Sequence, residues 1–146
     1  MDANRTVSDI LVNLFQQIWK LEEKALITEE YKDISVNDMH IIEAVGLDGG
    51  NNMSTIARKL DITVGSLTTS MNSLVLKNYV TRERSETDRR VVNICLTEKG
   101  KRAYRHHEQF HEEMAKAALQ SLSDAQIPPV IQTLQHLSEF FRSYDE

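Results

Sequence analysis

Both ends of the chain carry apolar residues at intervals of three and four, the repeat of a helix with one buried face. Over residues 6–30 this repeat predicts one long helix, whose apolar positions are Val7, Ile10, Leu11, Leu14, Phe15, Ile18, Leu21 and Ala25. A similar repeat after Pro128 and Pro129 predicts a C-terminal helix, whose apolar positions are Val130, Leu134, Leu137, Phe141 and Tyr144. The prolines have to lie near the start of that helix, because deeper inside they would break it.

Three shorter helices are predicted between residues 35 and 77. The first opens at the capping-box-like sequence Ser35-Val36-Asn37-Asp38 and runs to the glycines at 46, 49 and 50. Helices over residues 54–60 and 64–77 follow, joined by the tight turn Asp61-Ile62-Thr63. Two short helices joined in this way are typical of a helix-turn-helix.

The repeat of apolar positions then changes from 3.6 to 2. Residues 79–84 and 91–96 are β-prone, and the turn-forming residues 85–88 lie between them, so a hairpin is predicted. Thr97 is expected to cap a helix that runs to about Leu119, and residues 123–126 to cap the last helix. Two strands are too few for a sheet of their own. The expected fold class is mostly α with a small β-wing (α+β), a winged helix-turn-helix.

The chain has a net charge of −5, which by itself argues against DNA binding. The charge is unevenly distributed, however. Residues 58–105 hold eleven Lys/Arg and five Asp/Glu, a net charge of +6, and the rest of the chain carries −11. A basic middle in an acidic body indicates a nucleic-acid binder, although a merely solvated charged face is the alternative.

The predicted helix over residues 64–77 has one apolar and one polar face. Leu67, Met71 and Leu74 are expected to face the core. The residues that we expect to contact DNA from this helix are Ser66, Thr68, Thr69, Asn72 and Ser73. Their short hydrogen-bonding side chains suit base edges and phosphates of a major groove. No Arg or Lys lies between Lys59 and Lys77, so we expect recognition of A·T-rich sequence and DNA shape.

Residues 88–100 read Asp-Arg-Arg-Val-Val-Asn-Ile-Cys-Leu-Thr-Glu-Lys-Gly. This sequence resembles the wing of the MarR family of regulators, D-x-R-x-x-x-(V/I)-x-L-T-x-x-G. The resemblance implies a homodimer that reads a pseudo-palindromic operator in double-stranded DNA. It implies dimerisation helices at 1–34 and 98–146 around a DNA-binding head at 35–97. In the wing, Arg90 would enter the minor groove and Asp88 would orient the loop, and we expect Arg84 and Arg89 to contact DNA with them.

Within this family the chain is most similar to the FabT-like branch of fatty-acid-synthesis repressors. The stretches that carry this likeness include Lys32-Asp33-Ile34-Ser35, Met39-His40, Thr68-Thr69-Ser70, Arg84-Ser85-Glu86 and Phe110-His111. The resemblance implies that a long-chain acyl group on acyl carrier protein acts as co-repressor. The residues expected to form the effector pocket are Leu14, Ile18, Glu22, His40, His107, Phe110 and His111.

The same histidines leave two alternatives open. Glu22 (or Glu23), His40, His107 and His111 resemble the ligand set of zinc-sensing MarR regulators, which use one Glu and three His. A zinc-responsive repressor is therefore the alternative function, with zinc as the alternative cofactor. The other alternative is that these histidines are helix residues with no specific role.

Residues 107–111, His-Glu-Gln-Phe-His, match the zinc-protease motif H-E-x-x-H. A protease also needs a third ligand and a substrate cleft. The sequence points to neither, so we expect no enzyme and no resident cofactor. An interaction module that does not bind DNA is the remaining alternative. The absence of an apolar run of about 18 residues and of a signal peptide favours a cytoplasmic protein without membrane contact, and Cys95 is expected to be buried.

Overall fold

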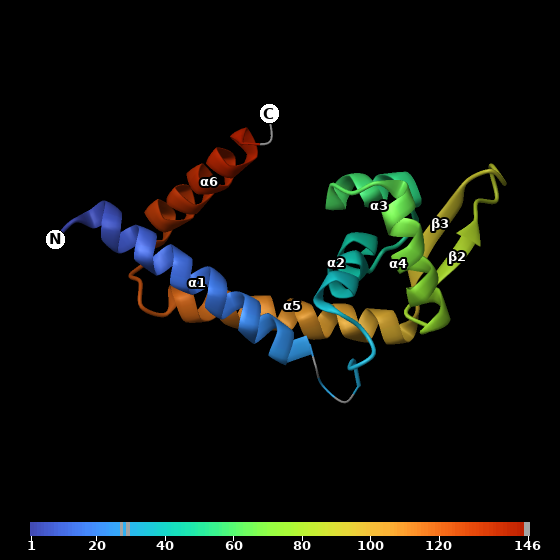
Figure 1. The fold of residues 1–146 in the computed structure, drawn as a ribbon, viewed down its shortest axis with the longest axis horizontal. Coiled ribbons are helices and arrows are strands. Elements are labelled where there is room, and N and C mark those ends of the chain that lie inside the picture. The colour runs from blue at the N-terminus through green and yellow to red at the C-terminus, as the bar shows by residue number, and fades with distance from the viewer. Residues whose placement is uncertain (27, 29, 145–146) are drawn as a thin grey trace. The chain divides into compact units, whose positions relative to one another are not determined.

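The computed structural model describes residues 1–26, 28 and 30–144, which are mostly helical with one small antiparallel sheet (Figure 1). Within these residues the elements are α1 (Ala3–Leu26), α2 (Val36–Val45), β1 (Asn51–Asn52), α3 (Met53–Leu60), α4 (Val64–Leu76), β2 (Val80–Arg84), β3 (Val92–Leu96), α5 (Glu98–Leu119) and α6 (Ile127–Ser143). The predicted fold class is confirmed, since all predicted helices and both predicted strands are present.

The sheet has one strand more than the sequence predicted. Its order is β1-β3-β2, and β2 and β3 form the expected hairpin, in which Val80 pairs with Leu96 and Arg84 with Val92. The additional strand, β1, has only two residues and pairs with Asn93 and Ile94 of β3. A strand of two residues shows no alternation of apolar and polar positions, so the sequence pattern does not reveal it.

The observed helix ends show which local sequence signals were sufficient to predict where a helix begins. Ser35 and Asp38 form the predicted capping box at α2. Pro128 and Pro129 occupy the first turn of α6, where proline is tolerated. Helix α1 begins three residues earlier than predicted, because the Asp2 carboxylate accepts hydrogen bonds from the following backbone N–H groups. It ends at Leu26, and residues 27 and 29 of the predicted helix lie outside the described residues, as do residues 145–146 of the predicted C-terminal segment.

The chain divides into two compact units, Met1–Phe110 and His111–Glu146. The first holds the hydrophobic core, formed mainly by α2, α3, α4 and the inner face of the sheet, with Leu26 of α1 and Ala103 of α5 packed against them. Leu67, Met71 and Leu74 of α4 are fully buried in it, as predicted. The second unit holds the end of α5 and all of α6. The predicted division into a head at 35–97 and flanking dimerisation helices concerns function and stays a prediction.

A close backbone approach joins the end of the helix-turn-helix to the start of α5. Thr97 donates from its backbone N–H to the Tyr79 carbonyl at 3.0 Å, and its hydroxyl oxygen accepts from the Gly100 N–H at 3.1 Å. Thr97 is thus the predicted cap of α5. A Cβ atom at Gly100 would lie 2.1 Å from the Tyr79 carbonyl oxygen, so this position admits only glycine.

The Tyr79 side chain extends the same junction to the segment before α2. Tyr79 is fully buried, and its hydroxyl donates to Asp33 Oδ1 at 2.7 Å. Lys99 lies 3.7 Å from Asp33 Oδ2 and 4.3 Å from the centre of the Tyr79 ring. Burial would raise the pKa of Asp33, but the Tyr79 hydrogen bond and the Lys99 charge outweigh it and lower the pKa below its usual 3.8. Burial and Asp33 together raise the pKa of Tyr79.

We predict that Gly100→Ala destabilises the protein by about 1–3 kcal/mol or more, because the added methyl group overlaps backbone that cannot move without disturbing the wing. Gly65→Ala is the control: its Cβ atom approaches no neighbour closer than 4.0 Å, and alanine favours a helix. Chemical denaturation of the three proteins measures both effects. Equal midpoints would contradict the close approach at Gly100.

We predict that Tyr79→Phe lowers the free energy of unfolding by about 1 kcal/mol at pH 7, through loss of the hydrogen bond to Asp33. Because the pKa of Asp33 is lowered in the folded protein, its contribution to stability is complete above the ordinary pKa and is lost as pH falls through the folded pKa. The difference between wild type and Tyr79→Phe should therefore shrink below about pH 4. Denaturation curves between pH 7 and 3 would contradict this if the difference stayed constant.

Candidate nucleic-acid interface

Helices α3 and α4 are joined by the three-residue turn that the sequence predicted. Asp61 adopts a left-handed conformation (φ 54°) at the end of α3, and the Ile62 N–H donates to the Ala57 carbonyl at 3.0 Å. Thr63 then caps α4, since its hydroxyl oxygen accepts from the Ser66 N–H at 3.1 Å. This turn fixes how α4 leaves α3, which is the geometry of a helix-turn-helix.

The predicted reading residues of α4 lie on its outer side, away from the core. Ser66, Thr68, Thr69 and Asn72 are exposed, and Ser73 is half-buried. Two of the hydroxyls have partners in the first turn of the helix or at its cap: Ser66 accepts from the hydroxyl of the cap residue Thr63, and Thr68 donates to the Val64 carbonyl. Whether each of these residues contacts DNA stays a prediction, but the structure places them together on the surface that α4 presents.

The loop between β2 and β3 is held by its own side chains. Ser85 accepts from the N–H groups of Thr87 and Asp88, and the Asp88 carboxylate accepts from both the backbone N–H and the Nε of Arg90, at 3.0 and 3.2 Å. The Arg84 guanidinium donates to the Arg89 carbonyl across the loop. The Arg90 side chain is 91% exposed, so its guanidinium is accessible at the tip of the wing.

The structure adds one residue that the sequence analysis did not select. The Arg82 guanidinium donates to the Asn72 side-chain oxygen and so joins the wing to α4. No spacing in the sequence singles it out, because the contact forms only when the hairpin folds against α4. The expectation that Cys95 is buried is wrong. Cys95 is partly exposed near the surface, where it lies beside Gly49 with its Sγ 3.7 Å from a Glu83 oxygen.

Known proteins share this arrangement. The family model for the transcriptional regulators SarA/Rot matches residues 22–107. FabT of Streptococcus pneumoniae, solved in complex with DNA, is 34% identical to this chain and superposes with a TM-score of 0.87, covering 96% of this chain and 98% of that one. The chain belongs to the MarR and SarA/Rot type of winged-helix transcriptional regulators.

Other relatives support the assignment as a transcriptional regulator. The HTH-type transcriptional regulator YfiV of Bacillus subtilis is 30% identical over 139 residues, covering 89% of this chain and 86% of that protein. A MarR regulator from Methanosarcina mazei, at 22% identity and a TM-score of 0.70, shares the fold. The predicted class of DNA-binding transcription regulator is thereby confirmed, and these relatives are named as regulators rather than enzymes. No helix within the described residues has the length and apolarity needed to span a membrane.

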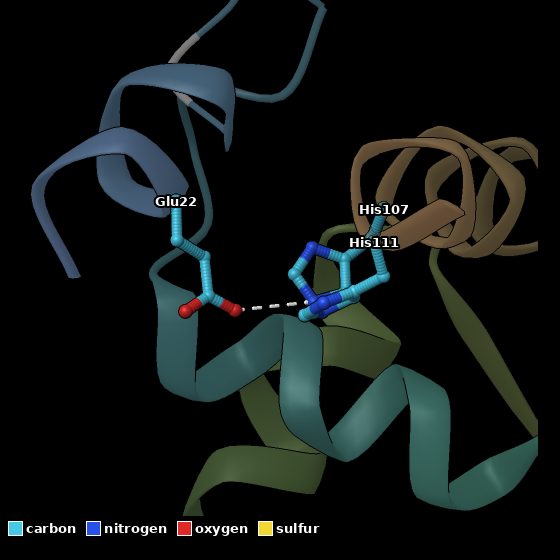
Figure 2. Close-up of side chains that lie close together, drawn as sticks. All are labelled: Glu22, His107 and His111. Atoms are coloured by element: carbon cyan, nitrogen blue, oxygen red, sulfur yellow. Dashed lines mark ion pairs between the residues drawn. The ribbon is translucent and has the colours of Figure 1, made fainter. Parts of the chain in front are cut away.

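Three residues of the predicted effector set meet in a polar cluster inside the first unit, in which Glu22 and His107 are buried and His40 is partly exposed. His107 of α5 is 1% exposed, and its Nε2 lies 3.2 Å from Oε1 of Glu22 on α1 (Figure 2). The same Glu22 oxygen lies 3.2 Å from Nε2 of His40 on α2. Glu43, which the sequence analysis did not select, approaches His107 Nε2 to 2.8 Å. The cluster thus joins three helices around one imidazole.

The remaining predicted effector residues are distributed differently. His111 follows His107 by one turn of α5, with a ligand nitrogen within 4.8 Å of it. Phe110 stacks on the His107 ring at a centroid distance of 6.3 Å. Ile18 is half-buried and Leu14 is 44% exposed on α1, so the predicted set does not form one apolar pocket within the described part of the chain.

Two open surface hollows lie beside the exposed Trp19 instead. One, of about 320 Å³, is lined by Phe15, Gln16, Trp19 and Lys20 of α1. The other, of about 340 Å³, lies between α1 and the start of α2, and its lining residues are Trp19, Glu23, Ser35, Val36, Asn37 and His40. Both are within the size range of small-molecule sites.

We predict that Arg90→Ala weakens DNA binding by about 1–3 kcal/mol and lowers the salt dependence of log K by about one unit, as loss of one groove-inserted cation should. Fluorescence anisotropy over a salt series measures both quantities. Arg5→Ala, which removes an exposed charge from α1, should leave the salt dependence unchanged. An unaltered affinity of Arg90→Ala at every salt concentration would remove the wing tip from the interface.

Proposed function

We propose that this regulator is a homodimeric repressor of fatty-acid-synthesis genes, with long-chain acyl-acyl carrier protein as co-repressor. The observation that carries the proposal is the likeness to FabT, which extends over nearly the whole of both chains at 34% identity. It agrees with the FabT-like stretches in the sequence, among them Lys32-Asp33-Ile34-Ser35 and Phe110-His111. A module that does not bind DNA is incompatible with the family to which the chain belongs.

The exposed apolar residues support the homodimer. On α1, Val7, Ile10 and Val12 are more than half exposed. Helix α6, all of whose residues are described, has no buried residue. Even its large apolar side chains are exposed, Leu134 by 59% and Phe140 by 53%. Large apolar side chains gathered on an exposed helix face mark an interaction site. A second copy of the chain would cover these faces and present two copies of α4 to a pseudo-palindromic operator.

The hollow on α1 supports an apolar effector. Phe15 and Trp19 line an open hollow of about 320 Å³ with apolar side chains, and Lys20 places a cation at its edge. A ligand shifts a conformational equilibrium only by its differential affinity for the two states. A co-repressor must therefore bind better to the DNA-competent form than to the other form of the protein.

We expect long-chain acyl-acyl carrier protein to tighten operator binding, and the carrier without its acyl chain to have little effect. The effect should increase with chain length, since each buried methylene contributes about 0.8 kcal/mol at most. Gel-shift titrations, starting from protein treated with a chelator, measure this. Trp19→Ala should reduce the response to the acylated carrier without changing DNA binding in its absence. A lack of response at every chain length would reject the lipid proposal and leave the regulator assignment intact.

A zinc-responsive repressor is the second candidate, and the polar cluster favours it. The ligand atoms of His40, Glu43 and His107 lie within 4.8 Å of one another, close enough to converge on one metal ion. Imidazole nitrogens and carboxylate oxygens are the ligands that zinc takes in proteins. The predicted set of Glu22, His40, His107 and His111 would change by the addition of Glu43.

For the zinc candidate we expect a chelator to abolish tight operator binding and added zinc to restore it. His107→Ala and His111→Ala should then behave alike, since each removes a ligand. His136→Ala, an exposed histidine of α6, is the control and should retain the zinc response. Zinc binding measured by calorimetry separates the two candidates, because the acyl proposal requires none. A full zinc response in His107→Ala would reject this site.

A further inference from the structure

Arg82 lies on the face of the hairpin that is turned toward the helices. Side chains alternate between the two faces of a strand, and residues paired in an antiparallel ladder share a face. Val80, two residues earlier, is buried, and Arg82 pairs with the buried Ile94 of β3. The guanidinium therefore extends from the core side of the sheet, over the edge of α4.

The contact with Asn72 fixes how that residue presents its side chain. The Arg82 guanidinium donates to the Asn72 side-chain oxygen, and both residues are exposed. In the reverse orientation the Asn72 NH₂ group would face the guanidinium, and two donors would then meet without an acceptor. The oxygen of Asn72 is thus turned toward the wing and its NH₂ group away from it.

We propose that Arg82 and Asn72 form a reader, built from β2 and α4 together, that selects guanine in the operator. A guanidinium has N–H donors beyond the one given to Asn72, and the NH₂ group of Asn72 adds two more, so the pair offers mainly donors. In the major groove guanine presents two acceptors, N7 and O6, whereas adenine presents one acceptor and one donor, and thymine one acceptor and a methyl group. Guanine is the base that matches. This inference rests on the proposed placement of α4 in a major groove.

The proposal changes the expected operator. No Lys or Arg lies between Lys59 and Lys77, so α4 itself is without a basic residue. On that basis the sequence predicted an A·T-rich operator. The fold brings a guanidinium to α4 from ten residues further along the chain, at the level of Asn72. Each half-site should therefore contain a guanine within otherwise A·T-rich DNA.

Selection from a random DNA library with the full-length protein, followed by sequencing, tests the proposal. The wild type should enrich a two-fold symmetric site with one guanine in each half. In Arg82→Met and in Asn72→Ala, preference for that guanine over adenine should fall at least about fivefold, the size expected for one specific base contact. Asn72→Asp keeps an acceptor for Arg82 but removes the NH₂ donors, so it should also lose the preference. The double variant should lose no more than either single variant, as for residues that act as a pair.

Arg84→Met is the matched control, since it removes the same charge two residues along the same strand face, where the guanidinium bonds to the Arg89 carbonyl rather than to α4. It should weaken binding to all sequences alike and keep the guanine. If Arg82→Met behaves in the same way, Arg82 only neutralises phosphate and the proposal is overturned. An enriched site that lacks any guanine sensitive to Arg82→Met overturns this inference alone. A wild type that enriches no sequence overturns the proposed function as well.

The fixed orientation of Asn72 has a readout that needs no DNA. In the free protein, the side-chain NH₂ resonances of Asn72 should be separate and ordered in the wild type and in Arg84→Met, and should show increased side-chain motion in Arg82→Met. Equal order parameters in all three proteins would show that Arg82 does not hold Asn72, and would overturn the proposal independently of any operator.

Discussion

The carbonyl group of Tyr79 is the point on which the reading head depends. It accepts the Thr97 N–H and lies against Gly100 so closely that no side chain fits between them. The same residue sends its hydroxyl to Asp33, in the segment before α2. Three parts of the chain that are remote in sequence thus meet around one buried tyrosine: the end of α4 with the start of β2, the start of α5, and the entry to α2. These contacts tie the end of α4 and the start of the wing to the first turn of α5.

Local signals in the sequence were sufficient for most of the fold. The capping residues Ser35 and Thr97, the turn at Asp61 and the prolines in the first turn of α6 each act on the backbone within a few residues. Their positions alone therefore predict where elements begin and end. Amphipathic repeats identified the core face of α4. Strand β1 was not predictable, because its two residues are extended only through pairing with β3.

The candidate sites also contain features that local sequence predicts and features that only the fold creates. The outer face of α4 follows from helical periodicity, and its exposure could be predicted from the sequence alone. Contacts between elements could not: Arg82 reaches Asn72 because the hairpin folds back against α4, and Glu43 reaches His107 because the fold brings these two positions of α2 and α5 together. In the polar cluster His107 lies more than 60 positions from both Glu22 and Glu43, and no spacing rule relates it to them. The predicted effector pocket mixed two environments, a polar one around His107 and an apolar one along α1.

The pairing of Asp88 with Arg90 affects the kinetics of the encounter with DNA. Because the Asp88 carboxylate lies 3.2 Å from the Arg90 guanidinium, the charge of this one arginine is offset by its neighbour. Such a pair has little field at a distance, so long-range attraction to phosphate has to come from other basic residues of the segment 58–105. The guanidinium acts only after close approach, when the groove competes with the aspartate for it. The wing tip should then govern how long the complex lives, whereas the rate at which protein and DNA meet is set elsewhere on the surface.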